Sequence, residues 1–347
     1  MRRFLRKTAL LSLPLILLLV LVNYFGDAAS IFDPEYERAM ASIILNGENV
    51  TNIDNYNERV FQRELISSFD SKKEVVVFGS SRTMLINSYH FPDAVLFNNS
   101  VSGAALQDVI ALFQMYALKN NVPDTIVLSV DPWLFNDNNG QSRWDAISNY
   151  YENYSSDEAI SLQSLRLSDY GQLLSLSYFQ ASLATLSRRM TGGADPVATQ
   201  RANNPTNTKL TDGSMVYNVA YRTASQAEVD AKIRGYLVGE IFNLENYDEI
   251  SVRFWNEFEG FVLDLLERNV EVEFFLCPYP PLVYRELQEN YPQVVRAETL
   301  VDSFASANNI TVYGSYNPYD LGFDETFFYD GMHCNEKGVN ALLSLGR

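Results

Sequence analysis

The chain has 347 residues, of which 47% are hydrophobic and 13% aromatic, and it carries a formal net charge of −17. A chain of this size can bury a large core, as one α/β domain with insertions or as two domains. Such an acidic surface repels nucleic acid and anionic lipid headgroups, so neither is expected as a ligand. With only two cysteines and two histidines, we expect no disulfide framework, no metal site and no cofactor.

Residues 1–26 form a candidate membrane anchor. Four basic residues precede a charge-free run over residues 8–26, which as a helix would measure about 28 Å and cross a bilayer core. Basic residues before the run and acidic ones after it orient the bulk of the chain outward. A cleavable signal peptide, with Ala28-Ala29-Ser30 as a weak cleavage site, is the alternative. Because the run is long for a signal peptide, we expect a single-pass protein of the cell membrane whose bulk is extracytoplasmic.

Residues 27–73 are expected to be a polar juxtamembrane segment with helices near residues 36–45 and 57–68. The alternation of strands and helices begins after it and runs to the C-terminus, over residues 74–347. This stretch is the expected core domain.

The first strand of that domain is the most informative stretch of the sequence. Four consecutive β-branched or aromatic residues, Val75 to Phe78, predict a strand that is covered on both faces. Gly79 lets the backbone turn sharply and present Ser80 and Ser81 above the strand end. Open α/β sheets carry their sites at such strand ends.

The later elements predict a parallel sheet of five strands with helices on both faces and right-handed crossovers. Residues 136–250 interrupt the alternation, and we interpret them as one large insertion after the third strand, serving as a lid or substrate platform. Inside it we expect helices near residues 161–174, 178–189 and 224–237, and a turn at Asp212-Gly213. The remaining strands are expected at residues 93–100, 125–130, 270–276 and 309–313, and the helices at 104–119, 251–268, 282–307 (with a break at Pro292) and after residue 335.

A serine nucleophile needs a base, and the base needs a carboxylate that orients it. His333 is the only histidine in the C-terminal two thirds of the chain, and Asp330 stands three residues before it. In one loop this carboxylate can fix the tautomer of the imidazole and stabilise the imidazolium. On its own the D-x-x-H pair is a weak signal, since a lone histidine is often structural.

Three motif blocks occur in order at predicted strand ends: Gly79-Ser80-Ser81-Arg82, Asn98–Gly103 and Asp330-Gly-Met-His333. In these blocks the chain resembles the SGNH/GDSL hydrolase superfamily, over about residues 74–131 and 251–346. The resemblance implies a flavodoxin-like, three-layer α/β/α fold. It also implies Ser81 as nucleophile, His333 as base and Asp330 as its partner, with the backbone N–H groups of Ser81 and Gly103 as the oxyanion hole. Ser80 replaces the usual Asp.

The third block of that superfamily, G-x-N-D, supplies an oxyanion donor from its Asn and is absent here. The third predicted strand ends in Ser129-Val-Asp-Pro-Trp133, which places Asp131 where the donor would be expected. A carboxylate repels an oxyanion unless it is neutralised. Asp131 therefore either pairs with Arg82 or caps the strand end, or it takes part in catalysis. Asn136 lies too far into the loop to substitute, and losing a donor typically costs on the order of 10²-fold in rate.

The missing third block, the single anchor and the large insertion are also similar to a membrane-anchored subset of the superfamily. This subset includes the D-alanyl transfer and alginate acetylation proteins of bacterial envelopes. It implies acyl transfer to or from a polymer, with a separate membrane protein as acyl donor. The preferred hypothesis is an extracytoplasmic serine esterase or O-acyltransferase acting on an envelope polysaccharide or related polymer. The alternative is a catalytically degenerate domain that binds glycan or scaffolds an envelope polymer assembly.

A few other residues are candidates for supporting roles. Trp133 and Tyr279 follow strand ends and either stack on a sugar ring or pack in the core. His90 lies near Phe91-Pro92, where a surface or packing role is favoured over catalysis. Cys277 and Cys334 form a candidate disulfide that would hold the histidine loop in place.

Overall fold

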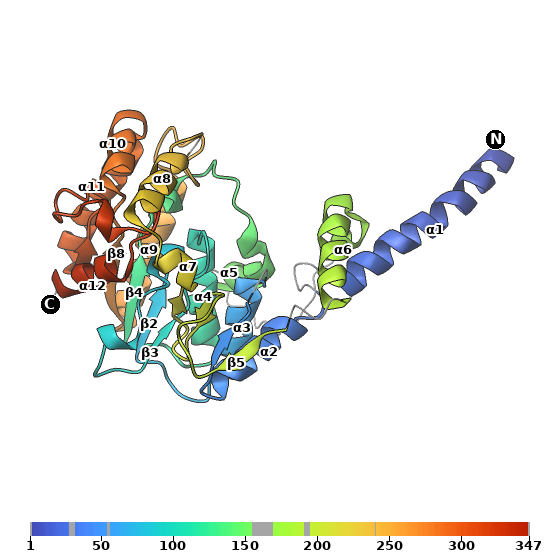
Figure 1. Ribbon diagram of the computed structural model, residues 1–347, viewed down its shortest axis with the longest axis horizontal. Helices are drawn as coiled ribbons and strands as arrows, with labels where there is room; N and C mark the ends of the chain where they lie inside the picture. The colour runs from blue at the N-terminus through green and yellow to red at the C-terminus, as the bar shows by residue number, and fades with distance from the viewer. Residues whose placement is uncertain are drawn as a thin grey trace.

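The computed structural model describes residues 2–27, 32–53, 56–154, 169–190, 195–239 and 241–345, without the side chains of residues 2–11, 169, 188, 189 and 345. Figure 1 shows an α/β body from which two helices project together, α1 (Arg2–Gly26) and α6 (Leu176–Met190).

The centre of the body is a sheet of five parallel strands in the order β3-β2-β4-β8-β9. All five predicted strands are therefore confirmed, and their order is that of flavodoxin-like sheets. β2 lies between β3 and β4, next to the point where the strand order reverses. The strands are β2 (Val75–Phe78), β3 (Leu96–Asn98), β4 (Thr125–Ser129), β8 (Glu271–Leu276) and β9 (Thr311–Gly314).

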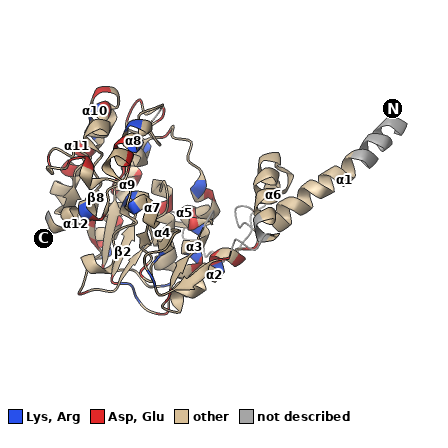
Figure 2. Cartoon of the chain, in the orientation of Figure 1, with Lys and Arg blue, Asp and Glu red and all other residues tan. Residues whose placement is uncertain are grey.

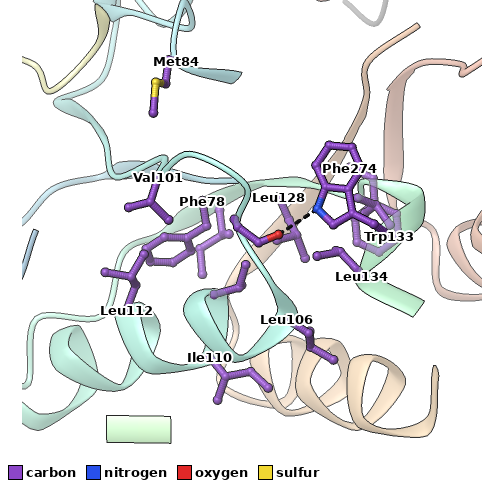
Figure 3. Packing of buried hydrophobic residues seen from close by; sticks show 14 of the residues in the cluster. Phe78, Met84, Val101, Leu106, Ile110, Leu112, Leu128, Trp133, Leu134 and Phe274 are labelled. Atoms are coloured by element: carbon purple, nitrogen blue, oxygen red, sulfur yellow. Dashed lines mark hydrogen bonds between the residues drawn. The ribbon is translucent and has the colours of Figure 1, made fainter. Parts of the chain in front are cut away.

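Side chains of β2 alternate between two cores, one on each face of the sheet. Val76 and Phe78 belong to the larger core, and Val75 and Val77 to the smaller one. Figure 3 shows Phe78 and Trp133 in the larger core. The indole N–H of Trp133 donates to the carbonyl of Ala104 at 2.9 Å. The larger core is covered by α4 (Leu106–Leu118), α9 (Val252–Glu267), α10 (Pro281–Asn290) and α11 (Pro292–Asn308), and the smaller one by α12 (Glu336–Leu345).

The segment before β2 differs from the polar juxtamembrane stretch that we expected. Its helices, α2 (Glu35–Leu45) and α3 (Glu58–Ser68), bury Met40, Phe61 and Leu65 completely in the larger core. Arg59 of α3 also makes two 2.9 Å hydrogen bonds to the buried carboxylate of Asp108 in α4. The apolar residues at helical spacing in this segment therefore face the core rather than solvent.

A second, antiparallel sheet joins this segment to the insertion, in the order β5-β1-β6-β7. The sequence did not predict it, because strands of two or three residues leave no detectable alternation. The predicted turn at Asp212-Gly213 connects β6 to β7, and Gly213 has a φ of +78°. The four strands are β1 (Asn49–Thr51), β5 (Val197–Thr199), β6 (Thr208–Lys209) and β7 (Met215–Val216).

The described part of the insertion contains four α-helices: α5 (Ser148–Tyr154), α6, α7 (Val219–Arg222) and α8 (Gln226–Tyr236). The helices expected near residues 178–189 and 224–237 are confirmed as α6 and α8. Of the helix expected near 161–174, residues 161–168 lie outside the described residues, and a 3₁₀ helix covers Asp169–Leu174.

The insertion also packs on the C-terminal end of α1. The side-chain amide of Asn23 donates to the carbonyls of Gln172, Leu173 and Ser175 at 3.1, 2.9 and 3.0 Å. Figure 2 shows no acidic or basic residue along the described side chains of α1, whereas the body carries charges of both signs. For the residues that the structure describes, none of the helices has both the length and the apolar character that a membrane span needs. The side chains of residues 8–11, in the expected anchor, lie outside them.

Candidate active site

The three residues expected to form a triad lie together at the C-terminal edge of the parallel sheet. The hydroxyl of Ser81 is 2.8 Å from Nε2 of His333. Nδ1 of the same ring lies 2.9 and 3.0 Å from the two carboxylate oxygens of Asp330. The fold thus joins side chains 252 positions apart in the geometry that activates a serine.

Local structure after β2 explains how Ser81 is presented. A 3₁₀ helix begins at Ser81, and the hydroxyl of Ser80 caps it by accepting from the N–H of Arg82 at 3.2 Å. Gly79 is needed because a Cβ at this position would lie 2.4 Å from Cβ of Ser129 and 2.5 Å from the hydroxyl of Thr83. Any larger residue would separate β2 from β4 and displace the serine.

Asp330 is held as a carboxylate by several donors. One of its oxygens accepts from the N–H groups of Met332 and His333, each at 2.9 Å, and the other from the hydroxyl of Tyr221 at 2.5 Å. Burial opposes ionisation, but the charge and hydrogen bonds of His333, with the bond from Tyr221, hold the pKa of Asp330 well below its usual range. A carboxylate that stays ionised stabilises the imidazolium formed during proton transfer.

Two backbone N–H groups are available for an oxyanion. Among the described residues, the N–H groups of Ser81 and Gly103 have no hydrogen-bond acceptor. Gly103 has a φ of +56°, and a Cβ there would lie 3.2 Å from Phe242. Both the backbone conformation and the space therefore favour glycine at this position.

Asp131 pairs with Arg82, which was one of the three roles that the sequence left open. The two groups are 3.0 Å apart and almost completely buried, and Asp131 also accepts from the hydroxyl of Ser129 at 3.1 Å. Asn136 is committed elsewhere, since its amide donates to the carbonyls of Asn243 and Glu245 at 3.0 Å each. Neither side chain takes the place of the third-block donor.

Arg82 connects three segments beneath the triad. Its guanidinium donates to the carbonyl of Met332 at 3.1 Å, to that of Pro278 at 2.9 Å and to that of Cys277. It also lies 4.1 Å from the ring centre of Tyr279. The buried cation therefore fixes the histidine loop against the ends of β2, β4 and β8.

The remaining sequence candidates occupy supporting or distant positions. Trp133 and Tyr279 are fully buried at 1% and 0% exposure, so they are core side chains and do not stack on a ligand. His90 lies away from the triad and has Nε2 2.8 Å from the side-chain oxygen of Asn340. Cys277 and Cys334 are free, buried thiols whose sulfur atoms are 3.7 Å apart, so the candidate disulfide is not formed in this structure.

A cavity of about 280 Å³ opens in front of Ser81 and His333. Apart from Ser102 of the second motif block, the rest of its wall comes from outside the motif blocks. The wall residues come from the N-terminal segment, the loops after β2 and β3, and the insertion: Ile53, Tyr56, Glu58, Met84, Ser102, Asn207, Met215 and Tyr217.

Two tyrosines of the insertion contact the triad directly. The hydroxyl of Tyr217 donates to the carbonyl of Ser81 at 3.3 Å, and its ring centre is 6.3 Å from that of His333. Tyr221 donates to Asp330, as described above. Burial, with the nearby charge of Asp330, raises the pKa of both tyrosines. Both remain protonated donors at neutral pH.

Comparison with known proteins adds no relative to this picture. No family model matches the chain, and a search of curated proteins found no match to it. The chemistry of the site is therefore inferred from its geometry and from its motif blocks.

Proposed function

We propose that the protein is an extracytoplasmic serine esterase or O-acyltransferase of the SGNH type, acting on acyl groups of an envelope polysaccharide or a related polymer. The observation that carries the proposal is the continuous chain of contacts from Ser81 through His333 to Asp330, at 2.8 and 2.9 Å. A cavity beside the serine gives an ester access to it.

In the proposed reaction, Ser81 attacks the acyl carbonyl while His333 takes the hydroxyl proton. The N–H groups of Ser81 and Gly103 stabilise the oxyanion of the tetrahedral intermediate. When the intermediate collapses, His333 gives its proton to the leaving alcohol and an acyl-Ser81 ester remains. Water or a sugar hydroxyl then attacks that ester in the same way, which regenerates Ser81 and yields hydrolysis or transfer.

The location and partners remain part of the proposal. Residues 1–26 would anchor the protein in the cell membrane, with the catalytic body on the extracytoplasmic side. The resemblance to envelope acyl-transfer proteins implies a separate membrane protein that supplies the acyl group.

One observation favours a second candidate, a degenerate domain that binds glycan or scaffolds an envelope polymer assembly. With Asp131 paired to Arg82 and Asn136 bonded elsewhere, the oxyanion hole has two donors instead of three. Removing one donor in other enzymes lowers the rate about 10²- to 10³-fold. A slow enzyme and a binding protein are therefore the two outcomes to separate.

Labelling with a fluorophosphonate serine probe separates them. We expect labelling of the full-length protein that is lost in Ser81→Ala and strongly reduced in His333→Ala. Ser303→Ala, which changes an exposed helical serine of α11, is the matched control and should label like the parent. If the parent protein does not react, or if Ser81→Ala reacts equally, the enzymatic proposal is wrong.

A further inference from the structure

We propose that the cavity in front of Ser81 is a subsite for one uncharged, hydroxyl-rich ring, such as a neutral sugar residue, bound by Glu58, Tyr56 and Asn207. The inference rests on the proposed function and names its substrate class. None of these three residues belongs to a motif block, and two of them come from the N-terminal segment.

Glu58 supplies a fixed carboxylate at the cavity wall. Its oxygens accept from the hydroxyl of Ser102 at 2.9 Å and from the N–H of Ser102, and its side chain is 16% exposed. Each carboxylate oxygen can accept two hydrogen bonds, so both keep capacity toward the cavity. Two adjacent hydroxyls of a sugar ring are spaced so that each can donate to one oxygen of the same carboxylate.

Tyr56 supplies a polar group that lacks a protein partner. Its hydroxyl is buried from solvent, and no described residue forms a hydrogen bond with it. Leaving such a group unsatisfied costs about 1–3 kcal/mol, and a ligand hydroxyl in the cavity would satisfy it. Asn207 adds a donor, because its side-chain oxygen is taken by the backbone and side chain of Asn218 at 2.9 and 3.2 Å while its NH₂ group remains for a ligand.

The charge of the wall decides against an anionic ligand. Glu58 is the only carboxylate among the described lining residues, and none of them is a lysine or arginine. Two buried cations outside the lining already have partners. Arg59 pairs with Asp108 at 2.9 Å and lies 3.7 Å from Glu58, and Lys209 donates to the carbonyl of Gly213 at 3.0 Å. A uronate or phosphate group in this cavity would meet the carboxylate of Glu58 and no lining lysine or arginine to pair with.

The apolar part of the wall fits the flat faces of a sugar ring. The rings of Tyr56 and Tyr217 and the thioethers of Met84 and Met215 line the same cavity. Its volume of about 280 Å³ is just below the range of pockets for drug-sized ligands, about 300–1,000 Å³. The space therefore suits a single ring with a short acyl group.

Binding to an inactive protein tests this subsite without turnover. We would measure, by ligand-observed NMR, the binding of a neutral methyl hexopyranoside and of the matching methyl uronoside to full-length Ser81→Ala in detergent. We expect the neutral glycoside to bind and the uronoside to bind at least about tenfold more weakly. Adding Glu58→Gln should weaken the neutral glycoside about tenfold and reduce the discrimination against the uronoside, and Tyr56→Phe should weaken it several-fold.

Glu289→Gln, an exposed residue of α10, is the control and should leave binding unchanged. Glu58→Gln keeps one oxygen for Ser102, and its melting temperature shows whether the fold is intact. Absence of glycoside binding, equal binding of the uronoside, or insensitivity to Glu58→Gln in a folded protein would each overturn the subsite. Labelling with the fluorophosphonate probe tests the enzymatic activity separately. If Ser81 is labelled but no glycoside binds, only the subsite proposal is wrong. If the glycoside binds but the parent protein is not labelled, the subsite proposal stands and the enzymatic proposal is wrong.

Discussion

Tyr221 is the residue of the site whose role is least visible in the sequence. It belongs to a four-residue helix of the insertion, α7, and its hydroxyl lies 2.5 Å from Asp330. In serine enzymes with a triad, the carboxylate orients the histidine and stabilises its charged form. A tyrosine that fixes this carboxylate acts on the reaction through His333, as a positioning residue.

We therefore expect Tyr221→Phe to lower kcat for p-nitrophenyl acetate about tenfold while KM changes little, because a hydrogen bond to a charged group contributes roughly 1.5–3 kcal/mol. Initial-rate kinetics over a range of ester concentrations measures both constants. Tyr89→Phe, at a tyrosine that is 92% exposed, is the control. A kcat within twofold of the parent would show that Asp330 needs no support from the insertion.

At the scale of the secondary-structure elements, one buried ion pair holds the ends of β2, β4 and β8 together. The side chains of Arg82 and Asp131 are 0% and 1% exposed, so each charge depends on the other for solvation. Removing one partner of such a pair typically costs about 3–5 kcal/mol, whereas replacing both with apolar residues costs far less.

Arg82→Met should accordingly destabilise the protein by about 3–5 kcal/mol, and the double variant Arg82→Met/Asp131→Leu by clearly less than the two single variants combined. Urea unfolding of the four proteins gives the coupling energy. The exposed pair Arg268–Asp264, at 46% and 32% exposure, provides the comparison, and Arg268→Met should cost less than about 1 kcal/mol. Additive effects for the buried pair would mean that the other bonds of Arg82, not Asp131, dominate.

The hairpin of β6 and β7 contains a further buried cation, Lys209, which is 1% exposed and which no carboxylate among the described residues contacts directly. Burial lowers the pKa of its amine to about 8, although Glu58 and Asp212 act in the opposite direction. The unfolded chain binds this proton more tightly, with a pKa of about 10.4. Stability therefore rises with pH between about 8 and about 10.4, and at neutral pH the charged amine costs about 3 kcal/mol.

We predict that Lys209→Met stabilises the protein at pH 7 by about 2–3 kcal/mol, and that the gain disappears above about pH 10.5. Denaturant unfolding at several pH values measures the difference. Arg285→Met, at an exposed residue of α10, controls for the loss of one positive charge. If the gain in stability does not depend on pH, it comes from the packing of the methionine and not from removal of the charged amine.

At the scale of the whole molecule, the site is assembled from stretches that lie far apart in the sequence. The five parallel strands could be predicted from the sequence, because runs of buried β-branched residues are local signals. The grouping of Ser81, Asp330 and His333 could also be predicted, because each residue lies in a motif block. The roles of Glu58, Tyr217 and Tyr221 could not, because they depend on the second sheet, whose strands have two or three residues. The pairing of Asp131 with Arg82 was one of three alternatives, and the 3.0 Å contact between the two buried side chains decides among them.

The contact between α1 and the insertion belongs to this scale as well. Asn23 is completely buried, and its amide satisfies three carbonyls at the end of the 3₁₀ helix and the start of α6. Losing these bonds should lower the local stability by about 1–3 kcal/mol.

In Asn23→Ala we expect amide hydrogen exchange in residues 172–180 to accelerate about tenfold or more, while exchange in β2 and β4 is unchanged. Tyr24→Phe, which alters a half-exposed neighbour, should leave both regions as in the parent. If Asn23→Ala accelerates exchange throughout the body, α1 is part of one cooperative unit with the sheet; if it changes nothing, the insertion is held by contacts other than Asn23.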